Sequence, residues 1–364
     1  MKLANRHRPF YSRRVKERPP TRGFSIAEIL VAVALGLLVL VGIVGLFVTN
    51  KRVYSNTVQT SELQENGRFA IEYLLQDLRH AYFFGEKHYD TIETDADPSA
   101  PKNADVYEDA DYHNCDGPDA IYIFNDKSAP VSAPVRGVAR LPLAYNNTTS
   151  EAIGCISDAA TKPDIPSDIL ILKSVKSRPL DRIEDLTYGT VYIASNRSSG
   201  VMRLYTAGTV MPSNSESCTG RAEECLPYGS YWPYHFAAYY VRDPGGNAPF
   251  MLARKIMQWD DGQGMKVVTQ DLIEGVEGMR FLYGIEGDNG VLTFQTADNV
   301  TNWADVVAVR LYLLLSTLEP DASYRDENSY TMGDTTVTST RGSHYRRILL
   351  TTTVMLRNQP MGDS

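Results

Sequence analysis

The chain has 364 residues, of which 43% are hydrophobic and 22% are charged, and this composition predicts folded domains rather than a disordered chain. The length is enough for one membrane segment and one large or two modest soluble domains. The net charge of −8 is unevenly distributed, because residues 1–23 are strongly basic and the remainder is acidic. The remainder has no basic stripe, so its composition gives no support to nucleic-acid binding.

The first 23 residues predict the orientation of the chain across a membrane. They contain eight Lys and Arg residues and one acidic residue, Glu17. A basic segment before an apolar helix keeps the N-terminus in the cytoplasm, and the rest of the chain is exported. A disordered tail that only sets this orientation is the alternative reading of these residues.

An apolar run comes directly after the basic segment. Residues 29–48 are twenty uncharged residues, which as a helix span about 30 Å, the thickness of a bilayer core. No small-residue cleavage site stands behind the run, so it does not read as a secretory signal that is cut after its apolar core. Glu28 lies at the start of the run, where an ionised carboxylate needs a partner.

The helical pattern continues beyond the apolar run. Apolar residues recur on one face (Leu63, Ala70, Leu74, Leu78 and Ala81), Phe69 and Tyr73 lie beside that face, and charged residues such as Glu62, Glu65 and Asp77 fall mostly between. Residues 24–97 contain no proline, so nothing forces a break. We therefore expect one helix over residues 24–81, apolar over 24–48 and amphipathic over 49–81.

The start of this helix resembles the class III signal of type IV prepilins and pseudopilins. The resemblance is carried by the basic leader that ends in Gly23, then Phe24, Glu28 and the uninterrupted apolar run. It implies that a prepilin peptidase cuts between Gly23 and Phe24 on the cytoplasmic side and N-methylates Phe24. The leader would then be residues 1–23.

Such a cut would create the partner that Glu28 lacks. The new amino group of Phe24 stays cationic after one methylation, and the resemblance implies a pair between Glu28 and the terminal amine of a neighbouring subunit. A pair of this kind sets register more than it adds net stability. The alternative is that Glu28 merely reaches the cytoplasmic interface.

Four further segments resemble the PilW-type minor pilins of type IV pilus assembly: LQENGRFAIEYLLQDLRHA, DLIEGVEGMRFLYGI, WADVVAVRLYLLLST and YRRILLTTTVMLRN. The resemblance implies a minor pilin that primes or caps the pilus. Its partners would be the prepilin peptidase, other minor pilins, the major pilin and the inner-membrane assembly platform. It would first be a single-pass inner-membrane protein with a periplasmic C-terminal domain, and then part of the pilus at the cell surface.

Residues 82–364 read as an exported, β-rich domain, of one lobe or two. Residues 90–120 are acidic and turn-rich, but they lack the D-x-D-x-D-G order of a calcium loop, so a solvated loop is favoured over a metal site.

Turn-like stretches at 260–264 and 286–290 predict hairpins. Strands are expected at 120–125, 168–175, 190–196, 235–243, 250–256, 279–285, 291–296, 305–317 and 345–358. In the strand over 305–317, Val307, Val309, Leu311, Leu313 and Leu315 alternate, which predicts one buried face. The fold class is therefore α+β, with antiparallel sheet packed on the amphipathic half of the helix.

The cysteines of the exported part are even in number, which favours two disulfides in an oxidising compartment. Four cysteines allow three pairings, of which we favour Cys218–Cys225, a short loop, together with Cys115–Cys155. Their spacing does not match a metal site. Reduced, buried thiols are the alternative.

No enzyme signature is found, whether a nucleophile elbow, a phosphate-binding loop or a zinc motif, so neither catalysis nor a cofactor is expected. The aromatic stretch at 231–240 is expected in the core rather than on a binding surface. Two other functions are the alternatives: a type II secretion minor pseudopilin, which shares the N-terminal signal, and a signal-anchored periplasmic adhesin or enzyme left uncleaved at Gly23. Gene neighbours would separate the first from a pilin, and a clustered polar site would mark the second.

Overall fold

The computed structural model describes residues 23–94, 134–139, 156, 158–160, 165–246, 248–262, 264–287, 289–338 and 344–358. It divides into two compact units, one that ends at Thr57 and one that begins at Val58. The expected strand at 120–125, the acidic stretch over 95–120, Cys115 and Cys155 lie outside the described residues.

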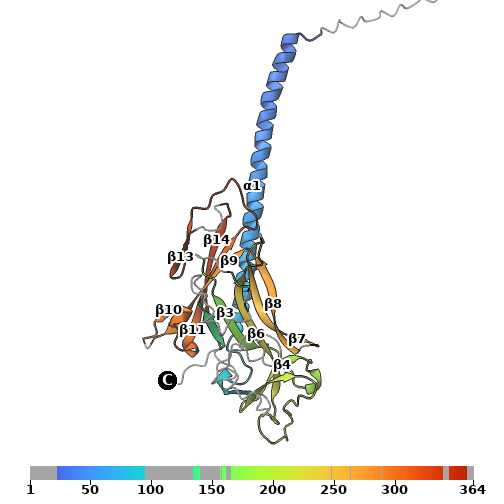
Figure 1. The fold of residues 1–364 in the computed structure, drawn as a ribbon, viewed down its shortest axis with the longest axis vertical. Coiled ribbons are helices and arrows are strands. Elements are labelled where there is room, and N and C mark those ends of the chain that lie inside the picture. The colour runs from blue at the N-terminus through green and yellow to red at the C-terminus, as the bar shows by residue number, and fades with distance from the viewer. Residues whose placement is uncertain are drawn as a thin grey trace, which may run out of the picture. The chain divides into compact units, whose positions relative to one another are not determined.

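A single helix, α1 (Ile26–His80), runs through both units (Figure 1). The expected helix over 24–81 is therefore confirmed to within two residues at each end. From Val58 onward, small and aliphatic side chains at helical spacing are buried: Leu63, Gly67, Ala70, Leu74 and Leu78. A Cβ on Gly67 would lie 2.4 Å from Cδ1 of Leu350, so this glycine permits the close approach of helix and sheet.

The larger of two main sheets has eight strands in the order β1-β5-β4-β6-β3-β2, with β7 paired to β6 and β8 paired to β7. All described pairs in it are antiparallel except β1 with β5. The strands are β1 (Ile92–Thr94), β2 (Val135–Val138), β3 (Ile169–Val175), β4 (Thr190–Ser195), β5 (Gly200–Tyr205), β6 (Ser230–Arg242), β7 (Met251–Asp260) and β8 (Gly264–Glu274).

The second main sheet is antiparallel and has four strands in the order β10-β9-β11-β14. A separate hairpin, β12–β13, covers part of it. The strands are β9 (Val276–Glu286), β10 (Leu292–Gln295), β11 (Val306–Ser316), β12 (Ser329–Met332), β13 (Thr335–Thr338) and β14 (Arg347–Met355). Four short 3-10 turns complete the described elements: η1 (Tyr89–Thr91), η3 (Ile183–Asp185), η4 (Ala297–Asn299) and η5 (Trp303–Asp305).

Gly275 is the junction between the two sheets. It separates β8 from β9 with φ +86°, which only glycine adopts readily, and a Cβ there would lie 2.7 Å from the carbonyl oxygen of Ser316. Its own N–H donates to the carbonyl of Phe250 at 2.7 Å, and its carbonyl accepts from the N–H of Ser316 at 2.8 Å. One chain segment thereby passes from the first sheet into the second while fixing the end of β11.

Of the long antiparallel strands, all but β8 appear where the sequence predicts them, and both predicted hairpin turns connect paired strands. The prediction for β6 begins too late, because the strand extends back to Ser230 to pair with β4. The strands β1, β2, β5, β8, β12 and β13 are not among the predicted ones. The aromatic stretch at 231–240 lies in the core as predicted, with Tyr239 and Tyr240 fully buried.

The expectation of one buried face for β11 is wrong at both ends. Near its start the register shifts between Val306 and Ala308, so these two residues are buried and Val307 is not. The C-terminal half is buried on both faces. Leu311, Leu313 and Leu315 are buried toward the main core, as the alternation predicts. Leu314 faces the other way and is also buried, because the β12–β13 hairpin packs over it with Tyr330, Met332 and Val337. An alternating pattern cannot reveal a cover supplied by a hairpin from elsewhere in the chain.

Candidate assembly site

The residues of the predicted cleavage and assembly signal lie just before α1 and in its first turn. Gly23 and Phe24 precede the helix, and the Phe24 side chain is 83% exposed. The carbonyl of Ser25 accepts from the N–H of Ile29 at 3.1 Å, so Ser25 occupies the N-cap position. The helix begins at the next residue, Ile26.

Glu28 and Ser25 form a reciprocal pair of hydrogen bonds. The N–H of Ser25 donates to Oε2 of Glu28 at 2.9 Å, and the N–H of Glu28 donates to Oγ of Ser25 at 3.2 Å. This is a capping box, in which the third helical residue satisfies the backbone donor of the cap. The carboxylate also lies at the positive end of the helix dipole. Before any cleavage, Glu28 therefore has a partner in its own chain.

Sequence reasoning missed this partner, although the signal is present. The order S-x-x-E directly before an apolar run is the usual signature of a capping box. Gly23 marks the predicted cleavage bond, but the cap is two residues further on. Nothing in the described residues brings a cationic group to Glu28.

The apolar part of α1 is exposed along its length. From Ile29 to Val48 the large hydrophobic side chains are exposed by between 42% at Val48 and 70% at Leu38. Among the described residues, α1 is the one helix long and apolar enough to cross a membrane, with a mean hydropathy of 3.1 in its most apolar window. An apolar surface of this size needs lipid or other protein chains to cover it.

In the second unit, a polar network ties α1 to the larger sheet. Asp77 accepts from the Tyr239 hydroxyl at 2.6 Å, lies 3.0 Å from Nε2 of His235, and is 3.7 Å from Nη1 of Arg254. The sequence placed Asp77 among the charges that fall between the apolar positions, but its side chain is only 15% exposed. Burial acts to raise the pKa of the Asp77 carboxyl, and the hydrogen bonds and charges of its partners outweigh burial and lower it.

The C-terminal end of α1 is bonded by the last residue that the structure describes. Nδ2 of Asn358 donates to the carbonyls of Arg79 and Ala81, each at 3.2 Å. Arg79 lies in the last turn of the helix and Ala81 directly follows it, where the carbonyl groups have no donor within the helix itself. The C-terminal end of the helix is therefore held by the side chain of Asn358, which follows β14.

Two buried arginines hold the smaller sheet to its surroundings. Arg347 on β14 donates to Glu277 at 2.7 Å and to Asp326 at 2.9 Å, and all three side chains are at most 1% exposed. Arg280 on β9 bonds Asp168 at 2.9 Å and also pairs with Asp334 in the turn of the β12–β13 hairpin. Each arginine thus connects a strand of the sheet to a segment outside it.

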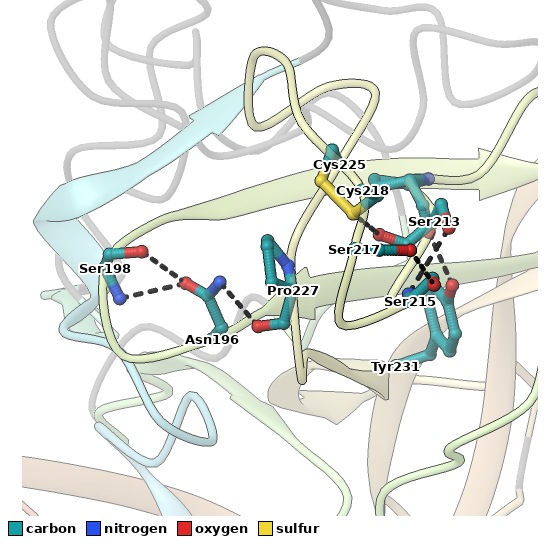
Figure 2. Close-up of a disulfide and its surroundings, with 10 residues drawn as sticks. Asn196, Ser198, Ser213, Ser215, Ser217, Cys218, Cys225, Pro227 and Tyr231 are labelled. Atoms are coloured by element: carbon teal, nitrogen blue, oxygen red, sulfur yellow. Dashed lines mark hydrogen bonds between the residues drawn. A yellow bond between two sulfur atoms is a disulfide. The ribbon is translucent and has the colours of Figure 1, made fainter.

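The structure joins Cys218 to Cys225 by a disulfide, the pairing favoured from the sequence (Figure 2). The backbone around it is bonded across the loop, since the N–H of Ser213 donates to Glu224 at 2.9 Å and the N–H of Leu226 donates back to Ser213 at 2.8 Å. The Tyr231 hydroxyl donates to the carbonyl of Pro212 at 2.5 Å and connects the loop to β6. The disulfide closes a loop in the connection between β5 and β6 of the larger sheet.

Part of the chain matches a known family. Residues 238–358 match the family model described as PilW, Type IV Pilus-assembly protein W. The matched region begins within β6 and includes the four-stranded sheet, the β12–β13 hairpin and Asn358. No curated protein and no solved structure matches the chain.

Proposed function

We propose that this chain is a PilW-type minor pilin that primes or caps the type IV pilus, because residues 238–358 match the family model of a type IV pilus-assembly protein. One observation carries the proposal most. The family-matched region folds against the second half of α1, and the first half of the same helix is an exposed apolar segment. A helix that is anchored at one end and uncovered at the other suits a subunit that exchanges lipid for neighbouring subunits.

The proposal assigns roles to the first residues of the helix. A prepilin peptidase would cut between Gly23 and Phe24 and methylate the new amino group. Gly23 has no side chain to obstruct a protease cleft. After cleavage, the amine would lie one residue before Ser25, close to the carboxylate that caps the helix. Glu28 would then either keep its local bond or meet the amine of a neighbouring subunit.

The proposed partners are the prepilin peptidase, other minor pilins, the major pilin and the inner-membrane assembly platform. The chain would first be held in the inner membrane by α1, with the second unit in the periplasm. An oxidising compartment is where a disulfide such as Cys218–Cys225 forms and persists. The exported unit would then become part of the pilus surface.

Mass spectrometry of the chain isolated from membranes and from sheared pili tests the proposal. We expect an N-terminal peptide that begins with methylated Phe24. Gly23→Val should block cleavage, because a branched side chain at this position would obstruct the cleft of the peptidase. Thr21→Val is the matched control, because it introduces the same side chain outside the predicted bond. Intact Met1 or Lys2 peptides as the dominant form would overturn the prepilin reading.

Deletion of the gene separates a pilin from a secretion pseudopilin. We expect loss of surface pili and of twitching motility, with secretion unchanged, and recovery when the wild-type chain is restored. Lost secretion with normal pili would favour the pseudopilin.

A further inference from the structure

A small pocket lies where α1 passes the end of β11. It has a volume of about 130 Å³ and is lined by Gln59, Glu62, Leu63 and Asn66 of the helix and by residues 316–319. This volume is roughly ten times the least that a water molecule needs, so the pocket has room for the head group of a large side chain. All of its lining belongs to the second compact unit.

Two buried oxygen atoms at this pocket have no hydrogen-bond partner. Ser316 is 3% exposed, and its Oγ is unbonded within the part of the chain that the structure describes. Oε1 of Gln59 is also buried and unbonded there. A buried polar atom without a partner costs free energy, so such groups in a folded protein are normally satisfied by something. Two of them in one pocket suit a ligand that donates hydrogen bonds.

The chemistry of the lining specifies a cation. Glu62 and Glu319 add two carboxylates, and neither forms an ion pair with any described residue. The pocket lining contains no Lys, Arg or His. Ammonium and guanidinium groups only donate hydrogen bonds, and the atoms left over here are acceptors: a side-chain carbonyl, a hydroxyl oxygen and carboxylates. A hydrogen bond from a charged donor to a carboxylate is also stronger than a neutral one.

We propose that this pocket receives the lysine or arginine side chain of a neighbouring pilin subunit in the assembled pilus. The proposal rests on the proposed function, because only a chain that assembles has such a neighbour. A cation from another subunit's helix is available in this kind of protein. The α1 of this chain itself exposes Lys51 and Arg52, and neither is paired within the described residues.

The geometry around the pocket keeps it open and in place. The N–H of Ser316 is bonded to Gly275, and the N–H of Thr317 donates to the carbonyl of Arg346 at 2.9 Å. On the helix side, Nδ2 of Asn66 donates to the carbonyl of Glu274 at 3.4 Å. The backbone of Ser316 and Thr317 and the side-chain amide of Asn66 are thus already bonded within the chain. The side-chain oxygens of the pocket remain to accept from the cation of the neighbouring subunit.

The test measures how much of the full-length chain, relative to the major pilin, is found in sheared pili. We expect Glu62→Gln with Glu319→Gln to lower this ratio at least threefold, because the substitutions keep the shape of the pocket and remove its charge. The control is Glu65→Gln with Glu327→Gln, two exposed carboxylates of the same helix and the same half of the chain that do not line the pocket. The control should keep the wild-type ratio.

Ser316→Ala separates binding from folding. The hydroxyl bonds nothing within the described chain, so its removal should not lower the resistance of the periplasmic domain to protease. It should still lower incorporation into pili at least twofold. Ser195→Ala is the matched control, because Ser195 is also fully buried with an unbonded hydroxyl but lies in β4, away from the pocket.

The outcomes distinguish a failure of the pocket inference from a failure of the proposed function. If the wild-type chain is in pili and the double glutamine variant enters them as well as its control does, the pocket does not bind a subunit cation. Protease resistance lost together with incorporation in Ser316→Ala would also overturn the inference, since the residue would then be structural. Absence of the wild-type chain from pili would overturn the proposed function and this inference with it.

Discussion

Asp77 of α1 and Tyr239 of β6 share a hydrogen bond of 2.6 Å across 162 positions of sequence. Tyr239 is fully buried, and β6 is the strand that pairs with β3, β4 and β7. The bond therefore connects the last turns of the N-terminal helix to the most connected strand of the larger sheet. Asp77 lies on one face of the helix. The bond therefore fixes the rotation of the helix about its own axis as well as its position along the sheet.

Replacing Asp77 should weaken this connection. Asp77→Asn should lower the free energy of unfolding of the full-length chain in detergent by about 1–3 kcal/mol, because His235 and Arg254 lose a charged acceptor. Gln76→Asn, one exposed position away, is the control. Urea unfolding measures the difference, and a change equal to that of the control would show that the network contributes nothing.

The same carboxylate predicts a dependence on pH. The pKa of Asp77 is lower in the folded protein than its ordinary value of 3.8, so the folded state favours the charged form. This stabilisation is present above pH 3.8 and is lost as pH falls through the lowered pKa. Unfolding measured from about pH 5 down to about pH 2 should show a steeper loss in the wild type than in Asp77→Asn. Parallel curves would contradict the assignment.

The buried arginine on β14 should be far more sensitive to substitution than an exposed one. Arg347→Met leaves the Glu277 and Asp326 carboxylates buried without their cation, which should cost about 3–5 kcal/mol of unfolding free energy. Arg182 and Glu184 form an exposed pair, with side chains 66% and 61% exposed, so Arg182→Met should leave stability almost unchanged. Thermal unfolding of the two variants side by side tests this, and equal shifts would refute it.

Three substitutions at the start of α1 separate helix capping from charge pairing. Glu28→Gln keeps a capping box, because glutamine also serves at this position, but it removes the charge. Ser25→Ala removes the cap at a cost of about 0.5–2 kcal/mol and keeps the charge. If Glu28 pairs with an amine, Glu28→Gln and Glu28→Ala should both be processed after Gly23 and both be depleted from pili.

Ser25→Ala should then be incorporated better than either Glu28 variant. Quantification of the mature chain in membranes and in pili measures both processing after Gly23 and incorporation into pili in one experiment. Normal incorporation of Glu28→Gln, together with depletion of Ser25→Ala, would show that the carboxylate acts only on its own helix.

The disulfide should stabilise one loop rather than the whole fold. It joins residues seven positions apart, so its removal by Cys218→Ser with Cys225→Ser should lower the free energy of unfolding by about 2–3 kcal/mol. Hydrogen exchange should rise over residues 213–229, which contain the disulfide loop, and stay unchanged in β9 and β11. Exchange that rises equally in the four-stranded sheet would contradict a local role.

The sequence predicts those parts of the fold that repeat a local pattern. Helix α1 is expected from apolar spacing and the absence of proline, and β9, β11 and β14 are expected from alternation or long apolar runs. Short strands such as β1 and β12 have too few residues to show a period. The capping box was within reach of the same reasoning, since Ser25 and Glu28 stand three residues apart.

The contacts that join distant segments could not be predicted in this way. Asp77 has the spacing of a solvated charge, and nothing near His235 in the chain indicates that the two side chains meet 158 positions apart. The pocket beside Ser316 likewise requires the end of a strand to meet a helix that precedes it by about 250 residues. Such partners are set by the topology of the sheets, which a single sequence does not display.

The bond from Asn358 to the end of α1 has a mechanical consequence. A load that enters the molecule along the helix reaches Ala81, where the covalent chain leaves the helix, and the same turn is held by a residue that comes after β14. Asp77 adds a second attachment, to β6. Tension along the helix is therefore divided between the bond to β6 in the larger sheet, the bonds to Asn358 beyond the smaller sheet, and the peptide connection after His80. If the proposed function holds, this arrangement would protect the subunit, when the filament is pulled, at the point where α1 meets the sheets.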